Sequence, residues 1–174
     1  LLTKSAAQGL TGDTGLNTEL NIIREQFRRF TIEQIEPHAQ RWHLENELIP
    51  ESLIKDMADL GIFGLTIPEE YGGSGESKVA MCVLSEELSR GYLGVGSLST
   101  RSDIAAELIL NGGTEIQKRY WLPKIACGEI LPTAVFTEPD VGSDLSSIKT
   151  KAIRNSETYK ISGSKTWVTH GSRA

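Results

Sequence analysis

The segment from Phe136 to Asp144, FTEPDVGSD, combines two hydroxyls, three carboxylates and a glycine within a few residues. Gly142 would let the backbone approach a ligand closely, and successive backbone N–H groups beside it could bind a phosphate. A loop rich in Pro, Gly and Asp is also common where a chain simply leaves a strand. The spacing alone therefore leaves a ligand-binding loop and a plain connection both open.

Other patterns with known chemistry are missing from the sequence. No Gly-x-Gly-x-x-Gly and no Gly-x-x-x-x-Gly-Lys-Ser/Thr is present, so neither of these two nucleotide-binding motifs is supported. The three histidines and the two cysteines have no metal-ligand spacing, and we predict no metal site. The acidic neighbours Glu86 and Glu87 would point in different directions on a helix, and we interpret them as part of a solvated face.

Composition narrows the class of protein. The chain has 174 residues, of which 39% are hydrophobic and 24% charged, which is typical of a globular protein. The formal net charge of −5 disfavours a binder of nucleic acid or of anionic membranes. No apolar run approaches the roughly 18 residues that a membrane span requires. Because Cys82 and Cys127 form no disulfide framework, we expect a cytoplasmic protein.

Helical periodicity dominates the sequence up to Gly128. Apolar residues at three- and four-residue spacing from Asn17 predict an amphipathic helix that bends or restarts at Pro37. A second helix is expected to run from Pro50 to a cap at Gly61, with Leu53, Met57 and Leu60 as its apolar stripe. Further helices are predicted over about 78–90, 95–110 and 114–121.

Local signals mark the ends of the last two of these helices. Asn111-Gly112-Gly113 predicts a left-handed cap, and Thr114 with Gln117 predicts a capping box. After Glu129 the pattern becomes strand-like, at 159–161 and 165–169, with Ser162-Gly163-Ser164 as the expected hairpin turn. We expect a linker or tail over 1–16, a helical domain over 17–130 and the start of a β domain over 131–174. Since so few strands cannot form a stable sheet alone, the chain is expected to be part of a longer protein.

Five motifs in order resemble the acyl-CoA dehydrogenase family. They are LTIPEEYGG, EELSRGY, GGTEIQKRYWLPKIACGEI, FTEPDVGSD and ISGSKTWVTHG, and the resemblance covers about Asn17 to Ala174. It implies a mainly α fold, with a helical N-terminal domain followed by the beginning of a β-barrel-like middle domain. The family's C-terminal four-helix bundle would be absent. Family members use FAD to remove an α-proton and a β-hydride from an acyl-CoA thioester, and pass electrons to an electron-transferring flavoprotein.

The resemblance also implies which residues hold FAD. Thr137 would contact the pyrimidine side of the flavin, Trp167 would pack near the ring, and Thr169 would hydrogen-bond to N5. Ser143 would lie near the FAD pyrophosphate and the thioester substrate. The stretches near Pro139 and Trp167 should therefore converge as two walls of a slot. The alternative for Trp167 is an ordinary core aromatic residue on a strand. The full set of implied cofactor residues is Ala134, Val135, Phe136, Thr137, Gly142, Ser143, Trp167, Val168 and Thr169.

Other parts of the family's active site are not expected in this chain. The glutamate that removes the α-proton comes from the C-terminal half, so we assign no catalytic residue between Leu1 and Ala174 and expect the chain alone to be inactive. An arginine and a glutamine of a neighbouring subunit complete the FAD site, which implies a dimer or tetramer of the complete protein. His170 stands where many relatives carry Asn, which bears on subfamily rather than on flavin binding.

The stretch from Ser85 to Ser102, with TRSDIAAELI and KTWVTH, is similar to the branch that oxidises (2S)-methylsuccinyl-CoA to mesaconyl-CoA in the ethylmalonyl-CoA pathway. The substrate of that branch has a free carboxylate, and burying this charge unpaired would be costly. We therefore predict that Arg101 or a neighbour pairs with the substrate carboxylate. The alternative is an arginine that faces solvent or pairs with Asp103 or Glu107.

Two other functions stay open at this point. The same scaffold could carry an acyl-CoA oxidase or a flavin monooxygenase. A non-catalytic binding or assembly module is the alternative from a different class.

Overall fold

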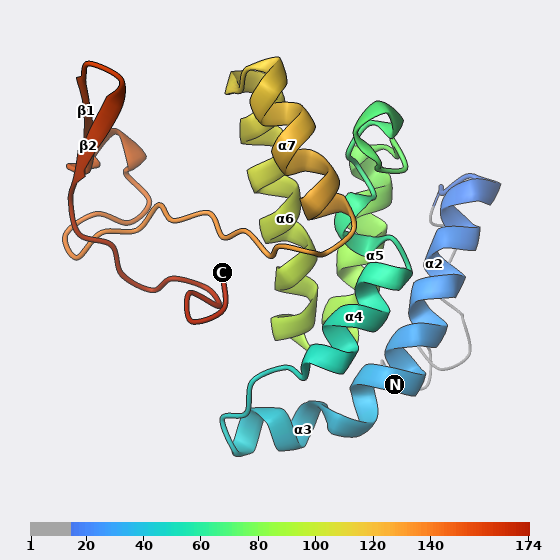
Figure 1. Ribbon diagram of the computed structural model, residues 1–174. Coiled ribbons are helices and arrows are strands. Elements are labelled where there is room, and N and C mark those ends of the chain that lie inside the picture. The colour runs from blue at the N-terminus through green and yellow to red at the C-terminus, as the bar shows by residue number, and fades with distance from the viewer. Residues whose placement is uncertain (1–14) are drawn as a thin grey trace. The chain divides into compact units, whose positions relative to one another are not determined.

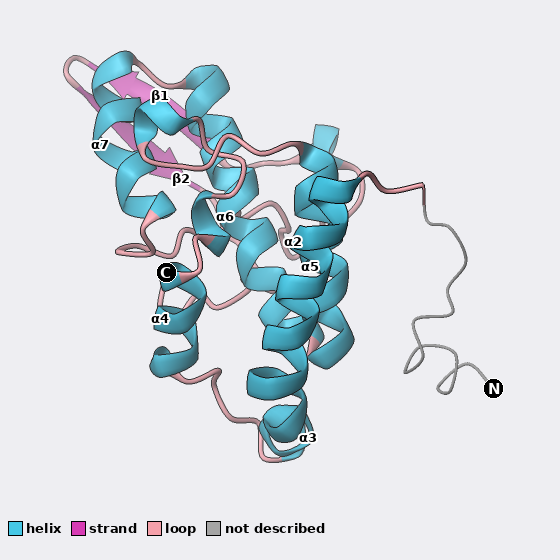
Figure 2. Cartoon of the chain, turned by 90° about the vertical axis from the view of Figure 1, so that its right-hand side faces the viewer, coloured by secondary structure: helices cyan, strands magenta, loops and turns pink. Residues whose placement is uncertain are grey.

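A computed structural model describes residues 15–174, which divide into two compact units. The first unit contains residues 15–54 and 76–97, and the second contains 55–75 and 98–174. Helices occupy most of the chain, and a single two-stranded sheet lies near the C-terminal end (Figures 1 and 2). Most of the predicted tail over 1–16 lies outside the described residues. The predominance of helix followed by the start of a β region agrees with the fold class expected from the sequence.

The first unit is built from α2 (Thr18–Phe30), a π-helical turn (Thr31–Ile35), α3 (Glu36–Leu44) and α5 (Lys78–Gly91). The Asn17 side chain caps α2 by accepting a hydrogen bond from the Leu20 N–H at 2.8 Å. Pro37 has no N–H to donate, and the π-helical turn immediately before it takes up the change in helix geometry. The predicted restart at Pro37 is therefore confirmed.

Close packing of α5 against the π-helical turn explains the glycine at its end. A Cβ at Gly91 would lie 2.6 Å from Thr31 Cγ2 and 2.9 Å from Ile35 Cγ2, so no larger residue fits without movement. Helix α5 ends at Gly91, next to its predicted end, and the main constraint on this glycine is the contact with the π-helical turn rather than backbone freedom. Buried apolar side chains of this unit include Phe27, Ile35, Trp42, Leu84 and Leu88.

The interpretation of Glu87 as part of a solvated face was wrong. Glu87 is only 2% exposed, and its carboxylate accepts hydrogen bonds from Arg28 Nη2 at 2.8 Å and Arg90 Nη1 at 3.1 Å. The hydrogen bond with Glu87 is the main reason that the pKa of Arg28 is raised. Two guanidinium partners offset the cost of burying this carboxylate. Glu86 beside it is exposed, as expected.

The second unit contains the C-terminal part of α4 (Glu51–Asp59), most of α6 (Leu93–Gly112) and all of α7 (Glu115–Ala126). Two 3₁₀ turns, Ile62–Gly64 and Glu69–Tyr71, connect α4 to the rest of the unit. Helices α6 and α7 lie side by side (Figure 1), and apolar residues of both helices form the core together with two residues of the segment after α4. The core residues are Ile67, Tyr71, Ala106, Leu122, Ile125 and Ala126.

The helix ends test the local sequence signals. The Thr114–Gln117 capping box is present, and α7 continues past its expected end to Ala126. Gly61 adopts a φ of +74° after α4 as predicted, although Leu60 is exposed rather than part of the buried stripe. The left-handed cap at 111–113 was wrong, because none of these residues has a positive φ. The extended backbone of the Thr114 N-cap turns the chain there instead.

The hairpin differs from the predicted one. Strands β1 (Lys151–Asn155) and β2 (Thr158–Ser162) pair antiparallel, with Lys151 opposite Ser162, and the turn lies at Ser156 and Glu157. The expected turn at 162–164 is not a hairpin turn, and 165–169 is not a strand. Gly163 serves a different purpose, since a Cβ there would lie 2.2 Å from Thr150 Oγ1.

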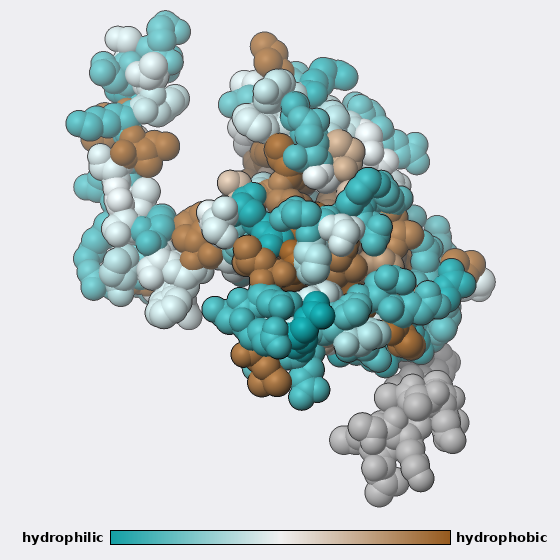
Figure 3. Space-filling view, turned by 60° about the horizontal axis from the view of Figure 1, so that its bottom comes forward, coloured by the Kyte–Doolittle hydropathy of each residue, from teal (hydrophilic) through white to brown (hydrophobic). Residues whose placement is uncertain are grey.

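Polar residues dominate the visible surface, with apolar residues in scattered groups (Figure 3). Within residues 15–174, no helix combines the length and apolarity needed to cross a membrane. The same residues contain no group of His, Cys, Asp or Glu placed to hold a metal ion.

Candidate cofactor and substrate site

Two segments distant in the sequence run side by side in the second unit. The Thr166 N–H donates to the Thr137 carbonyl at 3.1 Å, and Lys165 Nζ donates to the Phe136 carbonyl at 2.9 Å. Farther along, Thr133 Oγ1 donates to the Thr169 carbonyl at 3.0 Å. The structure thus brings the stretches near Pro139 and Trp167 together without regular strand pairing.

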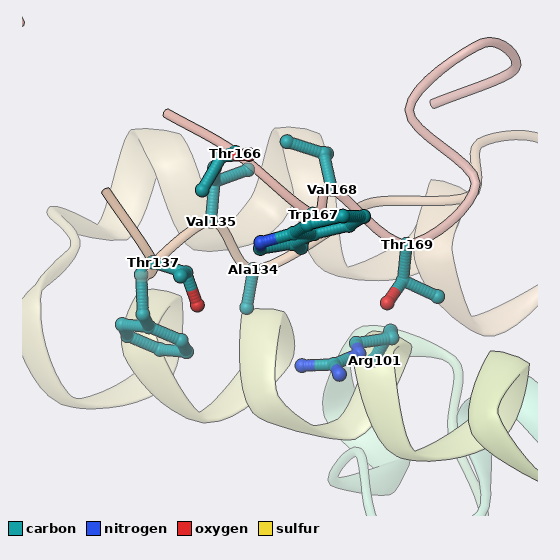
Figure 4. Close-up of a pocket in the computed structure, with 9 residues that line it drawn as sticks. Arg101, Ala134, Val135, Thr137, Thr166, Trp167, Val168 and Thr169 are labelled. Carbon is teal, nitrogen blue, oxygen red and sulfur yellow. The ribbon is translucent and has the colours of Figure 1, made fainter. Parts of the chain in front are cut away.

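A pocket lies where these segments meet (Figure 4). The pocket is lined by most of the residues proposed from the sequence to bind the cofactor and by Arg101 from α6. Thr166 also lines it, and this residue was not proposed from the sequence. Its position directly before the selected run Trp167–Thr169 was a signal that could have identified it. The lining residues are Arg101, Ala134, Val135, Phe136, Thr137, Thr166, Trp167, Val168 and Thr169.

Gly142 and Ser143 do not line this pocket. The Glu138 and Val141 backbones exchange two hydrogen bonds, of 2.9 and 3.2 Å, which close a tight turn before Gly142. Both Gly142 and Ser143 are exposed, and no atom lies within 4 Å of where a Cβ on Gly142 would be. Nearby, hydrogen bonds from Ser146 and Ser147 lower the pKa of Asp144.

Glu138 holds the two segments and the following loop in place, a role that the sequence analysis missed. Only 5% of the residue is exposed. Its carboxylate accepts hydrogen bonds from the Lys149 and Thr150 N–H groups at 2.8 and 2.9 Å and from the Thr150 hydroxyl, and it lies 3.0 Å from Lys165 Nζ. These donors, led by the Thr150 hydroxyl, lower the pKa of Glu138 to about 2. The sequence FTEPDVGSD shows the position of the Glu138 carboxylate, but it does not show which groups donate hydrogen bonds to it.

Arg101 contributes the pocket's one charged side chain among the described lining residues, and its side chain lies near that of Thr169 in Figure 4. Its Nε is buried, and no hydrogen-bond acceptor contacts this atom within residues 15–174. The described contacts of Asp103 and Glu107, the alternative partners considered above, are with other residues. Asp103 accepts a hydrogen bond from Thr66, and Glu107 Oε2 accepts one from Asn111 Nδ2 at 2.9 Å.

His170 follows the pocket lining and lies in an electropositive environment. Desolvation is the main reason that its pKa is lowered, and the positive charges of Arg173 and Arg101 lower it further. Its Nε2 lies 3.4 Å from the Pro132 carbonyl oxygen.

The lining fits a flat aromatic ring with a polar edge, which is the chemistry of a flavin. Ala134, Val135 and Val168 offer an apolar surface, while the Thr137 and Thr169 hydroxyls offer hydrogen bonds. The Trp167 side chain is 87% exposed, an unusual state for a large aromatic residue that a stacked ligand would relieve.

Comparison with known families decides the classification. Residues 17–129 match the acyl-CoA dehydrogenase N-terminal domain, and residues 133–174 match the middle domain of the same family. The chain belongs to the acyl-CoA dehydrogenase family.

Individual members of the family are similar over nearly the whole chain. The (2S)-methylsuccinyl-CoA dehydrogenase of Cereibacter sphaeroides is 60% identical over 93% of this chain and 30% of its own length. The glutaryl-CoA dehydrogenase of Desulfococcus multivorans is 34% identical over 93% of this chain and 42% of its own. A solved glutaryl-CoA dehydrogenase from Mycobacterium smegmatis, in complex with FADH2, superimposes with a TM-score of 0.86 at 29% identity, over 95% of this chain and 42% of its own. The chain thus spans less than half the length of these proteins.

Proposed function

We propose that this chain supplies the helical domain and one side of the flavin site of an FAD-dependent acyl-CoA dehydrogenase. The observation that carries the proposal is the convergence of residues 134–137 and 166–169 on one pocket in a member of this family. When bound, FAD would accept the hydride that leaves the β-carbon of the acyl-CoA.

The chain's own residues would bind and orient the ring. The Thr137 and Thr169 hydroxyls would hydrogen-bond to its polar edge, and the Trp167 side chain would cover it and exclude water. Ala134 and Val135 would set the position of the ring on the opposite wall. Fixing the ring in this way positions it against the substrate carbon, which is how a protein scaffold accelerates such a transfer.

Among residues 15–174, no carboxylate lines the pocket. Glu138 is the nearest candidate along the chain, but four donors stabilise its ionised form and hold its pKa at about 2. A general base works best with a pKa near the operating pH, so Glu138 would be a poor acceptor for the α-proton. We therefore propose that the base belongs to another part of the full-length protein, and that this chain alone is inactive.

The proposed substrate is (2S)-methylsuccinyl-CoA, with mesaconyl-CoA as the product. The 60% identity to the Cereibacter sphaeroides enzyme supports this choice over the more distant relatives. We further propose that an electron-transferring flavoprotein accepts the electrons and that the complete protein forms a dimer or tetramer. The reaction would belong to the ethylmalonyl-CoA pathway. The free thiols of Cys82 and Cys127 fit a reducing compartment, and we propose a cytoplasmic location.

Anaerobic titration of the full-length protein tests this function. Adding (2S)-methylsuccinyl-CoA should bleach the oxidised flavin absorbance, and mesaconyl-CoA should form in equal amount. A colourless protein that binds no added FAD would contradict the proposal and favour a non-catalytic module. Rapid reoxidation of the substrate-reduced flavin by oxygen would contradict it in favour of an oxidase or a monooxygenase.

A further inference from the structure

Arg101 is a charged side chain placed in an otherwise uncharged pocket. The other described lining residues are aliphatic, aromatic or Thr side chains, and none carries a charge. The charged residues Lys165 and Glu138 adjoin lining residues in the sequence, but they form an ion pair with each other. The Arg101 guanidinium is therefore not neutralised by the residues that share its pocket.

The buried Nε of Arg101 requires an acceptor. A buried donor without an acceptor destabilises the state that contains it, and more so when the donor carries a charge. A ligand that completes this pocket should therefore carry an anionic acceptor, and a carboxylate matches the planar guanidinium in geometry.

The geometry of a short diacid places such a carboxylate at the right point. In a monothioester of methylsuccinate the free carboxylate is bonded directly to the β-carbon, the atom that gives up the hydride. The partner of this carboxylate must consequently lie beside the flavin rather than at the far end of an acyl-binding tunnel. Arg101 shares one pocket with both proposed flavin-facing segments, 134–137 and 166–169.

We propose that Arg101 binds the free carboxylate of a branched dicarboxylic acyl-CoA with a four-carbon backbone, and so selects this substrate over uncharged acyl-CoA thioesters of the same shape. The inference rests on the proposed dehydrogenase function, and it assigns substrate selection to a single residue of α6. Arg101 has no part in the hydride or proton transfer itself.

Paired substrates test this assignment in the full-length holoenzyme. In 2-methylbutyryl-CoA a methyl group replaces the carboxylate, so the two thioesters differ only at the group that Arg101 is proposed to bind. Arg101→Met should lower kcat/KM for methylsuccinyl-CoA by about 100-fold, and change that for 2-methylbutyryl-CoA by less than about threefold. Arg101→Lys, which keeps the charge but loses the two-pronged geometry, should recover about tenfold of the loss. Arg154→Met removes an exposed arginine from β1 and should change neither value.

Binding provides a readout that does not depend on turnover. Calorimetric titration should show that Arg101→Met weakens mesaconyl-CoA about 100-fold and leaves tiglyl-CoA, its uncharged counterpart, nearly unchanged. Equal losses for the charged and uncharged ligands would overturn the inference. Loss of FAD from the variant would also overturn it, because it would indicate that Arg101 binds the cofactor rather than the substrate. If the unmodified enzyme oxidises neither thioester, the proposed function fails. If it oxidises methylsuccinyl-CoA and Arg101→Met is unaffected, only the assignment of Arg101 fails.

Discussion

The Glu138 carboxylate lies 3.0 Å from the Lys165 ammonium and joins the two segments that line the pocket. Lys165 also donates to the Phe136 carbonyl at 2.9 Å, so one side chain bonds to both the backbone and the carboxylate of the opposite segment. Hydrogen bonds that involve a charged group contribute more than neutral ones. The spacing of the proposed flavin walls thus depends on residues that do not line the pocket.

Loss of this ion pair should weaken cofactor binding. In the full-length protein, Lys165→Met removes both contacts to the opposite segment and should raise the dissociation constant for FAD by about tenfold. Quenching of flavin fluorescence on titration of the apoprotein measures this constant. Lys149→Met is the matched control, because its ammonium is exposed and pairs with Asp140 at the longer distance of 3.4 Å. Equal FAD affinity in the two variants would show that the ion pair does not position the walls.

The lowered pKa of Glu138 predicts a pH dependence of stability. Its folded-state pKa is about 2, below the ordinary value of 4.5, so ionised Glu138 stabilises the folded protein above pH 4.5. This contribution should be lost as the pH falls from 4.5 towards 2. Comparing thermal midpoints of the full-length protein and its Glu138→Gln variant at several pH values isolates it, since the other carboxylates are common to both. The difference should shrink on acidification, and a difference that is constant between pH 3 and 6 would refute the assignment.

Glu87 should be essential to the stability of the first unit. Glu87→Gln leaves Arg28 and Arg90 without their shared counter-charge and should lower the free energy of unfolding by about 3 kcal/mol. Glu86→Gln changes the exposed neighbour on the same helix and should stay within about 0.5 kcal/mol of the original protein. Denaturant midpoints of the two variants test this contrast. Similar small losses in both would mean that the buried network contributes little.

Two glycines of the second unit should respond in opposite directions to alanine. A Cβ at Gly64 would lie 2.9 Å from Ala126 Cβ, so Gly64→Ala should destabilise the protein by about 1–3 kcal/mol. At Gly112, the last residue of α6, no atom lies within 4 Å of an added Cβ and φ is not positive. Gly112→Ala should therefore stabilise by up to about 1 kcal/mol. Thermal unfolding distinguishes the two, and a loss at Gly112 would contradict the packing description.

Features that depend on neighbouring residues were predictable from the sequence. The capping box of Thr114 and Gln117 and the break at Pro37 rest on hydrogen bonds within a few residues, and both were confirmed. The convergence of the segments near Pro139 and Trp167 followed from the resemblance rather than from periodicity. Their contacts are isolated hydrogen bonds and form no ladder that a two-residue repeat would reveal.

Features that depend on distant partners were missed. Burial of Glu87 requires Arg28, which lies 59 positions away, and no local pattern indicates that contact. The hairpin turn was misplaced because Gly163 looks like a turn residue, whereas it avoids a clash with Thr150. Glu138 was noticed only as a member of a motif, because its donors Lys149, Thr150 and Lys165 come from later in the chain.

A crystal structure of the full-length protein with FAD bound tests the central claim most directly. The account predicts that the isoalloxazine ring contacts both Ala134–Thr137 and Thr166–Thr169, with the Thr169 hydroxyl at hydrogen-bond distance from the ring. A ring bound elsewhere, with the space between these segments filled by protein side chains, would contradict it.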